Sequence, residues 1–277
     1  IYILFDKKAQ INRELKEELE SVVKESTLYF TKEIPIYWGD YSLVEAELEL
    51  FTTALKNNDY SMYHLLSGVD LPLDTAENIY NFFDERKDYN FLTMVSNELF
   101  EKNKIYERVS FKYLAPHLSS RSVNNKILKK ILNIYRKFEI SIQRKLKVDF
   151  FKKFAIELKY ASNWCSLNHK AVQVLVKERE LIEKVFKQTK VNDELFIPTI
   201  LEKNDLLKVV LKKYPKAFYA NNSVVIEDMI NQQISRAIYV ILIGGMEAHT
   251  VGQILMKMLN NLNMVKNKDT YFQGNLI

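Results

Sequence analysis

One strand and the loop that follows it are predicted by the stretch Tyr63-His64-Leu65-Leu66-Ser67-Gly68-Val69-Asp70-Leu71-Pro72-Leu73. The first four residues are typical of a short buried strand, and the later Gly and Pro favour a loop. Asp74 and Glu77 then have the spacing of a capping box, which predicts a helix that reaches Phe83. A strand, a loop and a helix in this order are the repeating element of α/β proteins.

The same alternation continues on both sides of this stretch. We expect strands at residues 1–5, 27–30, 91–94 and 108–113. We expect helices at residues 12–25, from the capping-box spacing of Ser42 and Glu45, and after Asn168 as an N-cap. The pattern predicts an α/β fold with a mostly parallel sheet flanked by helices. Residues 1–5 have the apolar pattern of a buried strand from the first residue onward. We therefore expect that a first βα unit precedes Ile1 in the complete fold.

Composition favours one ordinary globular domain over residues 1–277. The chain has 277 residues, of which 47% are hydrophobic and 27% charged, and only six glycines and five prolines, so long flexible linkers are not expected. Cys165 is the only cysteine, which rules out a disulfide within the chain and suits a reducing compartment. The longest uncharged apolar run, residues 237–246, is too short to span a bilayer. We therefore expect a cytoplasmic protein.

Several common kinds of active site have no sequence signature here. The chain lacks Gly-x-Gly-x-x-Gly, a Walker loop, Gly-x-Ser-x-Gly, His-Glu-x-x-His and Asp-x-Asp. The four histidines are scattered, and a structural role is expected for His64, His117, His169 and His249. No metal site is expected, because the paired oxygen ligands that hold a divalent metal at a diphosphate are missing.

The positive charge of the chain is concentrated in one segment. Residues 121–160 contain 12 Lys or Arg and 3 acids, a local charge of +9, although the whole chain carries only +5. Apolar residues recur at helical spacing between the cations from Ile127 to Phe138. This amphipathic segment suits a solvated surface helix, an anionic membrane surface or nucleic acid. Nucleic acid is not expected as a partner because no nucleic-acid motif is present.

Three groups of residues could carry chemistry. Ligands of α/β sheets bind beyond the carboxyl ends of the strands, which places Asp6 and residues 67–73 at the expected ligand edge. Asp6 could accept from a nucleobase or ribose, and Trp38 could stack on the base, although both residues also suit a structural turn. Residues 67–73 could equally be an ordered loop. The adjacent carboxylates Asp193 and Glu194 could cap a helix or supply a general base.

Taken in order, these segments resemble the branching β-1,6-N-acetylglucosaminyltransferase family, which includes the peptide xylosyltransferases. The matching stretches are residues 1–8, 38–46, 63–73, 162–167 and 193–199. The resemblance covers about the first 200 residues, and Leu-Leu-Ser-Gly-x-Asp-Leu-Pro-Leu is its most specific part. Residues 201–277 diverge from the family pattern.

The resemblance implies a GT-A-like fold and an inverting transfer without a metal or other cofactor. A sugar of the N-acetylglucosamine or xylose type would pass from a UDP-sugar to a hydroxyl of a glycan or a lipid-linked acceptor. Glu194 would be the general base, and Trp164 would lie near the acceptor. The residues that would bind the donor are Asp6, Trp38, Ser67, Asp70 and Arg236.

Two departures from the family pattern keep an alternative open. Arg236 is the only candidate found for the family's basic diphosphate ligands, and Ala161 stands where the family commonly has Gly. The alternative is a catalytically inactive sugar-nucleotide-binding or scaffold protein of the same fold. For the active enzyme we expect a bacterial role in polysaccharide assembly, with peripheral contact to the inner face of the membrane through the basic segment and through residues 251–262.

Overall fold

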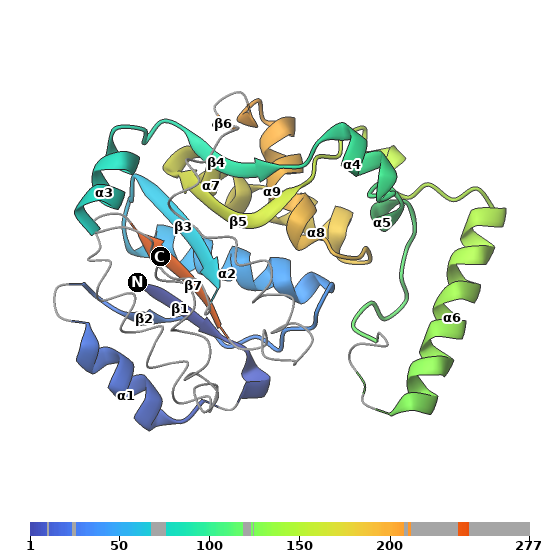
Figure 1. The fold of residues 1–277 in the computed structure, drawn as a ribbon, viewed down its shortest axis with the longest axis horizontal. Coiled ribbons are helices and arrows are strands. Elements are labelled where there is room, and N and C mark those ends of the chain that lie inside the picture. The colour runs from blue at the N-terminus through green and yellow to red at the C-terminus, as the bar shows by residue number, and fades with distance from the viewer. Residues whose placement is uncertain are drawn as a thin grey trace, which may run out of the picture.

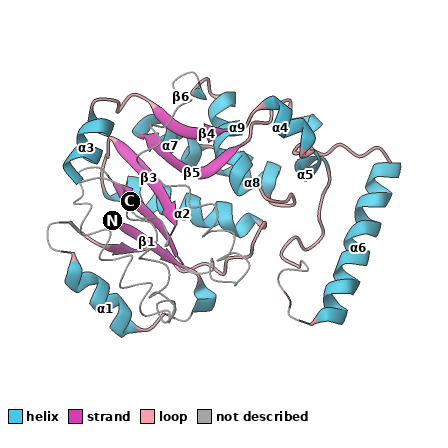
Figure 2. Cartoon of the chain, viewed as in Figure 1, coloured by secondary structure: helices cyan, strands magenta, loops and turns pink. Residues whose placement is uncertain are grey.

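A computed structural model describes residues 1–9, 11–23, 26–67, 76–118, 123, 125–207, 210–211 and 238–243. Its strands form a single sheet with helices around it (Figure 2). Of the loop predicted at residues 67–73, Ser67 is the last residue of β3 and residues 68–73 lie outside the described residues, as do the predicted helix start at Asp74 and residues 251–262.

The sheet has seven strands in the order β2-β1-β7-β3-β5-β4-β6 (Figure 1). Their bounds are β1 Tyr2–Phe5, β2 Tyr29–Phe30, β3 Met62–Ser67, β4 Asn90–Met94, β5 Ala161–Asn168, β6 Val210–Leu211 and β7 Ile238–Ile243. Strands close to the start of the chain therefore pair with β7, which comes much later in the sequence. In β1, Tyr2 pairs with Ile241 and Phe5 pairs with Ile238.

The prediction of an α/β architecture is confirmed, but the sheet is mixed. β2, β1, β3, β4 and β6 run in one direction, while β7 and β5 run in the opposite one. Hydrogen-bonded pairing is parallel between β1 and β2 and between β4 and β6, and antiparallel between the other neighbours. The prediction of mostly parallel pairing was wrong because β5 and β7 enter the sheet between strands that precede them in the chain. Apolar periodicity identifies a strand, but it does not identify its neighbours.

One face of the sheet is covered by α2 (Tyr41–Asn57), α7 (His169–Lys177), α8 (Arg179–Phe186) and α9 (Asp193–Lys203). Alternate strand residues point to this face, because successive side chains of a strand point to opposite sides. They join the helices in the main core, to which the strands contribute Tyr2, Leu4, Tyr63, Leu65, Leu92, Cys165 and Leu167. Burial of these large side chains is the main stabilising contribution on this face.

The opposite face has a smaller cluster. Phe83 of α3 (Ala76–Asp84) packs there against Met62 of β3 and Phe91 of β4. At the end of the sheet formed by β2, α1 (Arg13–Val22) lies beside this strand (Figure 1). Lys16 of this helix places its ammonium 5.8 Å from the ring centre of Phe5.

Most predicted elements are present. The strands predicted at residues 1–5, 27–30, 63–66 and 91–94 and the helices predicted at 12–25 and after Asn168 are confirmed. Residues 108–113 were wrongly predicted as a strand, because Glu107–Ser110 forms the short helix α5 and the residues after it are extended without a strand partner. The N-cap of α2 is Asp40 rather than Ser42, since the Asp40 carboxylate accepts from the Ser42 N–H at 2.8 Å.

The remaining helices lie around β4 and beyond the body of the protein. α4 (Asn97–Lys102) and α5 follow β4, and short 3-10 helices occur at Lys7–Ala9 and Lys152–Phe154. The predicted basic amphipathic helix is α6 (Lys126–Lys145), capped by Asn125. It stands beside the rest of the structure (Figure 1).

Candidate active site

The candidate site lies at the edge of the sheet where β1, β3 and β4 end and β5 begins. Met94, at the end of β4, pairs with Ala161, at the start of β5. Tyr160, directly before β5, is therefore at the same edge as Asp6, directly after β1. This is the edge at which the sequence predicts a ligand.

Asp6 is buried and holds the chain that follows β2. Its side chain is 2% exposed, and its Oδ1 accepts from the N–H groups of Lys8 at 3.0 Å and Ile36 at 3.2 Å. Lys8 Nζ lies 3.5 Å from the other carboxylate oxygen and 4.0 Å from the centre of the Tyr37 ring. Asp6 thus has a clear structural role, and its contact with a nucleobase or ribose remains a prediction.

A pocket of about 420 Å³ opens next to Asp6. It is lined by Lys7, Lys32, Glu33, Ile34, Pro35, Tyr37, Asp40, Ser42, Glu45 and His117. The rings of Tyr37 and His117 are 5.7 Å apart, so two aromatic groups border the pocket. Its charges are mixed, with two lysines and three acids, and Glu33 is neutralised in part by Lys16 at 2.9 Å. The pocket therefore suits a polar, largely uncharged group with a flat ring.

Trp38 lies on the turn that leads from this pocket to α2. Its side chain is 48% exposed. Gly39 has a φ of +68°, a conformation that side chains with a Cβ adopt only with strain. The carbonyl oxygen of Gly39 accepts from the N–H of Val191 at 3.0 Å. The turn at Trp38 is thereby fixed to the segment that leads into Asp193 and Glu194.

Glu194 lies in the first turn of α9 and is 29% exposed. Arg108 of α5 donates from Nη1 to Glu194 Oε2 at 2.9 Å, and the guanidinium lies 5.2 Å from the centre of the Tyr160 ring. Burial raises the pKa of Tyr160, and the charge of Glu194 and a hydrogen bond with it raise it further. Glu194 is therefore held by a cation and a phenol, with part of its surface open to a ligand.

Beneath Glu194 lies a group of acids with no hydrogen-bond partner at several oxygens. Both carboxylate oxygens of Glu47 on α2, and Oδ1 of Asp193, are buried without a partner. Burial, and then the charge of Glu194, raise the pKa of Asp193 to about 7. Burial, and then the charge of Asp193, raise the pKa of Glu47 well above its usual value. Burial also raises the pKa of the Cys165 thiol, so this thiol has little tendency to react.

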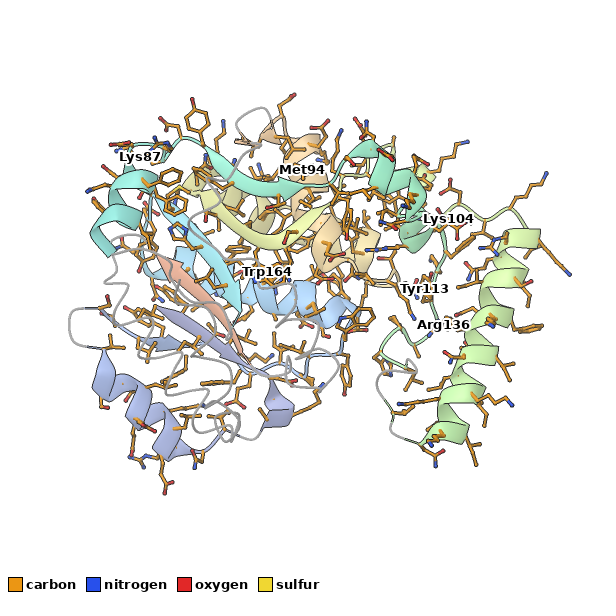
Figure 3. All side chains as sticks on the ribbon, in the orientation of Figure 1. Lys87, Met94, Lys104, Tyr113, Arg136 and Trp164 are labelled. Carbon is orange, nitrogen blue, oxygen red and sulfur yellow. The ribbon has the colours of Figure 1, made fainter. Side chains whose placement is uncertain are left out.

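The structure brings some of the predicted site residues together. Asp6, Trp38 and Glu194 all lie at one edge of the sheet, and the contact between Gly39 and Val191 connects the last two. Trp164 lies within β5 and is half-buried (Figure 3). Because it alternates with Cys165 of the main core, it faces the side of the sheet opposite to α9. Its contact with an acceptor remains a prediction.

The other predicted donor residues lie wholly or partly outside the described residues. Ser67 ends β3, but its side chain lies outside the described residues, and so do Asp70 and Arg236. His249 also lies outside them. The predicted structural roles of two histidines are confirmed, since His64 Nδ1 lies 2.8 Å from Ser166 Oγ and His169 Nδ1 lies 3.1 Å from Tyr63 Oη.

Three residues of the site were missed in the sequence. Arg108 was assigned to a strand, Tyr160 was not singled out, and His117, which lines the pocket, was given only a structural role. Local pattern carries no signal for Arg108, because its partner Glu194 is 86 residues away. Arg108 could have been identified as a site residue only from the predicted need for a cation in the site.

No group of three or more His, Cys, Asp or Glu side chains is arranged to hold a metal ion within the part of the chain that the structure describes. No helix among the described residues combines the length and the apolar character that crossing a bilayer requires.

Comparison with known families gives the class of this protein. The model for "Branch: Core-2/I-Branching enzyme" matches residues 3–213, about three quarters of the chain and all of the candidate site described above. The match makes the chain a glycosyltransferase by family, acting in general with a sugar-nucleotide donor and a glycan acceptor. It belongs to the Core-2/I-branching enzyme family. A search of curated proteins found no match to the chain.

Proposed function

We infer that this protein is an inverting glycosyltransferase that uses a UDP-sugar. It transfers a sugar of the N-acetylglucosamine or xylose type to a hydroxyl of a glycan or lipid-linked acceptor, and Glu194 is the general base. The family match supports sugar transfer, while the donor, the stereochemistry and the base belong to the proposal. A GT-A-like fold, a cytoplasmic location and a bacterial role in polysaccharide assembly are part of the same proposal.

The position of Glu194 is the observation that carries this proposal. Its carboxylate is partly exposed at the edge of the sheet where β1 ends, and the loop before it is bonded to the turn that bears Trp38. A base that acts on an acceptor hydroxyl must lie close to the bound donor. The bond between Gly39 and Val191 couples these two parts of the site.

Inversion proceeds by one displacement at the anomeric carbon. The acceptor oxygen forms the new bond as the bond to the UDP oxygen breaks, and the acceptor proton passes to Glu194. Arg108 binds Oε2, and Oε1 is the oxygen that we assign to take the proton. Arg108 therefore positions the base.

The donor would be divided between two environments. The pocket beside Asp6 has mixed charge and two aromatic groups, which suits the uridine part. The diphosphate needs cations that stabilise the negative charge of the leaving group. Arg236 is the candidate that the sequence offers for this role in a segment that diverges from the family pattern, and Lys7 and Lys32 are the cations that line the described pocket. No metal is assigned to the reaction.

The test is a panel of UDP-sugars assayed for transfer and hydrolysis with the wild-type protein and with Glu194→Gln. We expect the variant to lose activity by about a hundredfold to ten-thousandfold, the usual contribution of a general base, while UDP binding by calorimetry changes little. Glu180→Gln on α8, which alters a 91% exposed carboxylate, is the matched control and should keep full activity. Equal activity of Glu194→Gln and wild type would refute the assigned base.

The same panel is run with EDTA. Activity that persists with the chelator supports cationic side chains at the diphosphate, and strict dependence on a divalent metal would overturn that part of the proposal.

A second candidate is a sugar-nucleotide-binding protein without turnover. It is favoured by the ion pair itself, because the Glu194 carboxylate already has a charged partner at 2.9 Å. This candidate predicts that UDP binds to the wild-type protein while no sugar is transferred or hydrolysed for any donor of the panel.

A further inference from the structure

α6 exposes most of its apolar side chains. None of its apolar residues is buried, and Ile127 is 72% and Phe138 65% exposed. The exposed apolar residues of this helix and its C-cap are Ile127, Leu128, Ile131, Ile134, Tyr135, Phe138, Ile142 and Leu146. A soluble domain rarely leaves so many large apolar side chains of one element in water, so this face marks an interaction surface.

The helix is attached to the protein through a different, polar face. Arg136 donates to the carbonyl oxygens of Leu114, Ala115 and Leu118 at 3.4, 3.3 and 3.1 Å. Glu139 accepts from the N–H of Leu114, and Gln143 bonds to both the N–H and the carbonyl of Lys112. Figure 3 shows Arg136 on the side of α6 that faces Tyr113 and the body.

These contacts fix the orientation of the helix. Arg136, Glu139 and Gln143 follow one another at spacings of three and four, so they share one side of α6. Ile127, Ile131, Ile134 and Phe138 share another side for the same reason. The polar attachment therefore holds the apolar face away from the segment at residues 112–118.

Cations border the apolar face. Lys126, Lys130 and Lys137 are exposed and follow one another at spacings of four and seven, which places them along one flank. Glu139 is the only acid of the helix, and it is 8% exposed and bound to Arg136. The solvent side of α6 is thus an apolar stripe with a row of lysines, which is complementary to apolar groups beneath a negative surface.

This charge pattern distinguishes between the occupants. The phosphates of a nucleic acid would bind the lysines along the flank of α6. The Ile and Phe side chains of the apolar stripe would then remain in water. A second copy of α6 would cover the apolar stripe but would bring one lysine row close to another. A bilayer with anionic headgroups satisfies both parts, because long lysine side chains can extend to the phosphates while the stripe enters the acyl region.

We propose that α6 is an interfacial helix that docks this protein on an anionic lipid bilayer. The side chains of Ile127, Ile131, Ile134 and Phe138 enter the boundary between headgroups and acyl chains, and Lys126, Lys130 and Lys137 bind lipid phosphates. The segment that holds α6 also carries His117 of the pocket, so the docked helix connects directly to the candidate site. The proposal concerns binding and is independent of the proposed sugar transfer.

The test is co-sedimentation of the full chain with vesicles. We expect binding to vesicles made of phosphatidylcholine and phosphatidylglycerol in equal parts, weak binding to phosphatidylcholine alone, and loss of binding as salt is added. Ile131→Asp/Phe138→Asp should lower the vesicle partition coefficient by about tenfold or more, and Lys130→Gln/Lys137→Gln should lower it by a similar factor and reduce its salt dependence. Leu99→Asp on α4 alters an apolar side chain that is 46% exposed and serves as the matched control, with wild-type binding.

Other outcomes overturn the proposal. No binding of the wild-type chain to anionic vesicles at low salt, or wild-type binding by Ile131→Asp/Phe138→Asp, would refute it. A dimer in light scattering that this variant dissociates would assign the face to a second copy. A marked fall in the melting temperature of the variant would assign it to a segment of this chain, because an exposed face predicts an unchanged melting temperature.

Discussion

Arg108 Nη1 lies 2.9 Å from Glu194 Oε2, although 86 residues separate the two side chains in the sequence. The pair joins α5, which follows β4, to the first turn of α9, which packs against β5. It therefore fixes the proposed base relative to two parts of the fold that the chain itself leaves far apart. Both side chains are about one quarter exposed, so the pair orients a group that remains accessible.

Replacing Arg108 should affect catalysis more than stability. An ion pair with this exposure contributes about 1 kcal/mol or less to folding, so Arg108→Met should unfold close to the wild-type urea midpoint. We expect kcat to fall by about tenfold to a hundredfold, because the carboxylate loses its orientation, while the KM for the donor changes little. Arg108→Lys keeps the charge but not the paired donors of the guanidinium, so its kcat should lie between those of Arg108→Met and the wild type. A wild-type kcat for Arg108→Met would show that the pair does not position the base.

Glu47→Gln should change how stability depends on pH. Folding raises the pKa of Glu47 well above 4.5, so its favourable contribution is present at low pH and is lost as pH rises from 4.5 through the raised pKa. In that window the free energy of unfolding of the variant should fall less steeply than that of the wild type, by up to about 1.4 kcal/mol per pH unit. Urea unfolding at a series of pH values measures both slopes. Glu49→Gln, a partly exposed position on the same helix, should keep the wild-type slope, and identical slopes for all three proteins would contradict the prediction.

His64 should destabilise the protein in acid. Burial lowers the pKa of His64 from 6.5 to about 4, so the unfolded chain takes up a proton in this interval while the folded chain does not. Stability from this residue is therefore present above pH 6.5 and is lost as pH falls toward 4, by up to about 1.4 kcal/mol per pH unit. His64→Gln should remove that loss while keeping a side chain able to bond Ser166. An unchanged difference between the two proteins across this interval, in thermal or urea unfolding, would count against a neutral buried imidazole.

Gly39→Ala should strain the turn that carries Trp38. An added Cβ would lie 3.5 Å from Val191 Cγ2, an ordinary contact, so the cost comes from the backbone at φ +68°. We expect a loss of about 1 to 2 kcal/mol in the free energy of unfolding, and a smaller loss for Gly39→Asn, which tolerates this conformation better. If the turn borders the donor, Gly39→Ala should also weaken UDP binding in calorimetry. Equal stability of the two variants would mean that the turn relaxes to another conformation.

Periodicity and capping predicted much of the fold. The buried runs at β1, β3 and β4, the helix expected over residues 12–25 and the cap at Asn168 were recognisable because each depends on neighbouring residues. The wrong prediction of a strand at residues 108–113 has an identifiable reason. Val109, Phe111 and Tyr113 are all buried, but the chain is helical at the first and extended after it, with the Tyr113 N–H bonded to the carbonyl of Gln188 instead of a strand.

The site was harder to predict than the fold because its parts meet only in three dimensions. Asp193 and Glu194 were recognised as adjacent carboxylates at a helix start, but nothing nearby in sequence indicates Arg108, Tyr160 or the buried Glu47. Glu47 lies in the middle of α2 and is buried, whereas charged residues are normally on the exposed face of a helix. Such a departure can be recognised once the burial of α2 is known.

The place of β7 has a consequence for how this protein is made. β7 lies between β1 and β3 and is hydrogen-bonded to both, yet it is translated long after them. Until residues 238–243 leave the ribosome, β1 and β3 each lack a neighbour on one side, and an unpaired strand edge attracts other chains. The nascent polypeptide should therefore depend on chaperones for most of its synthesis, and premature termination before β7 should yield aggregates rather than a smaller folded protein.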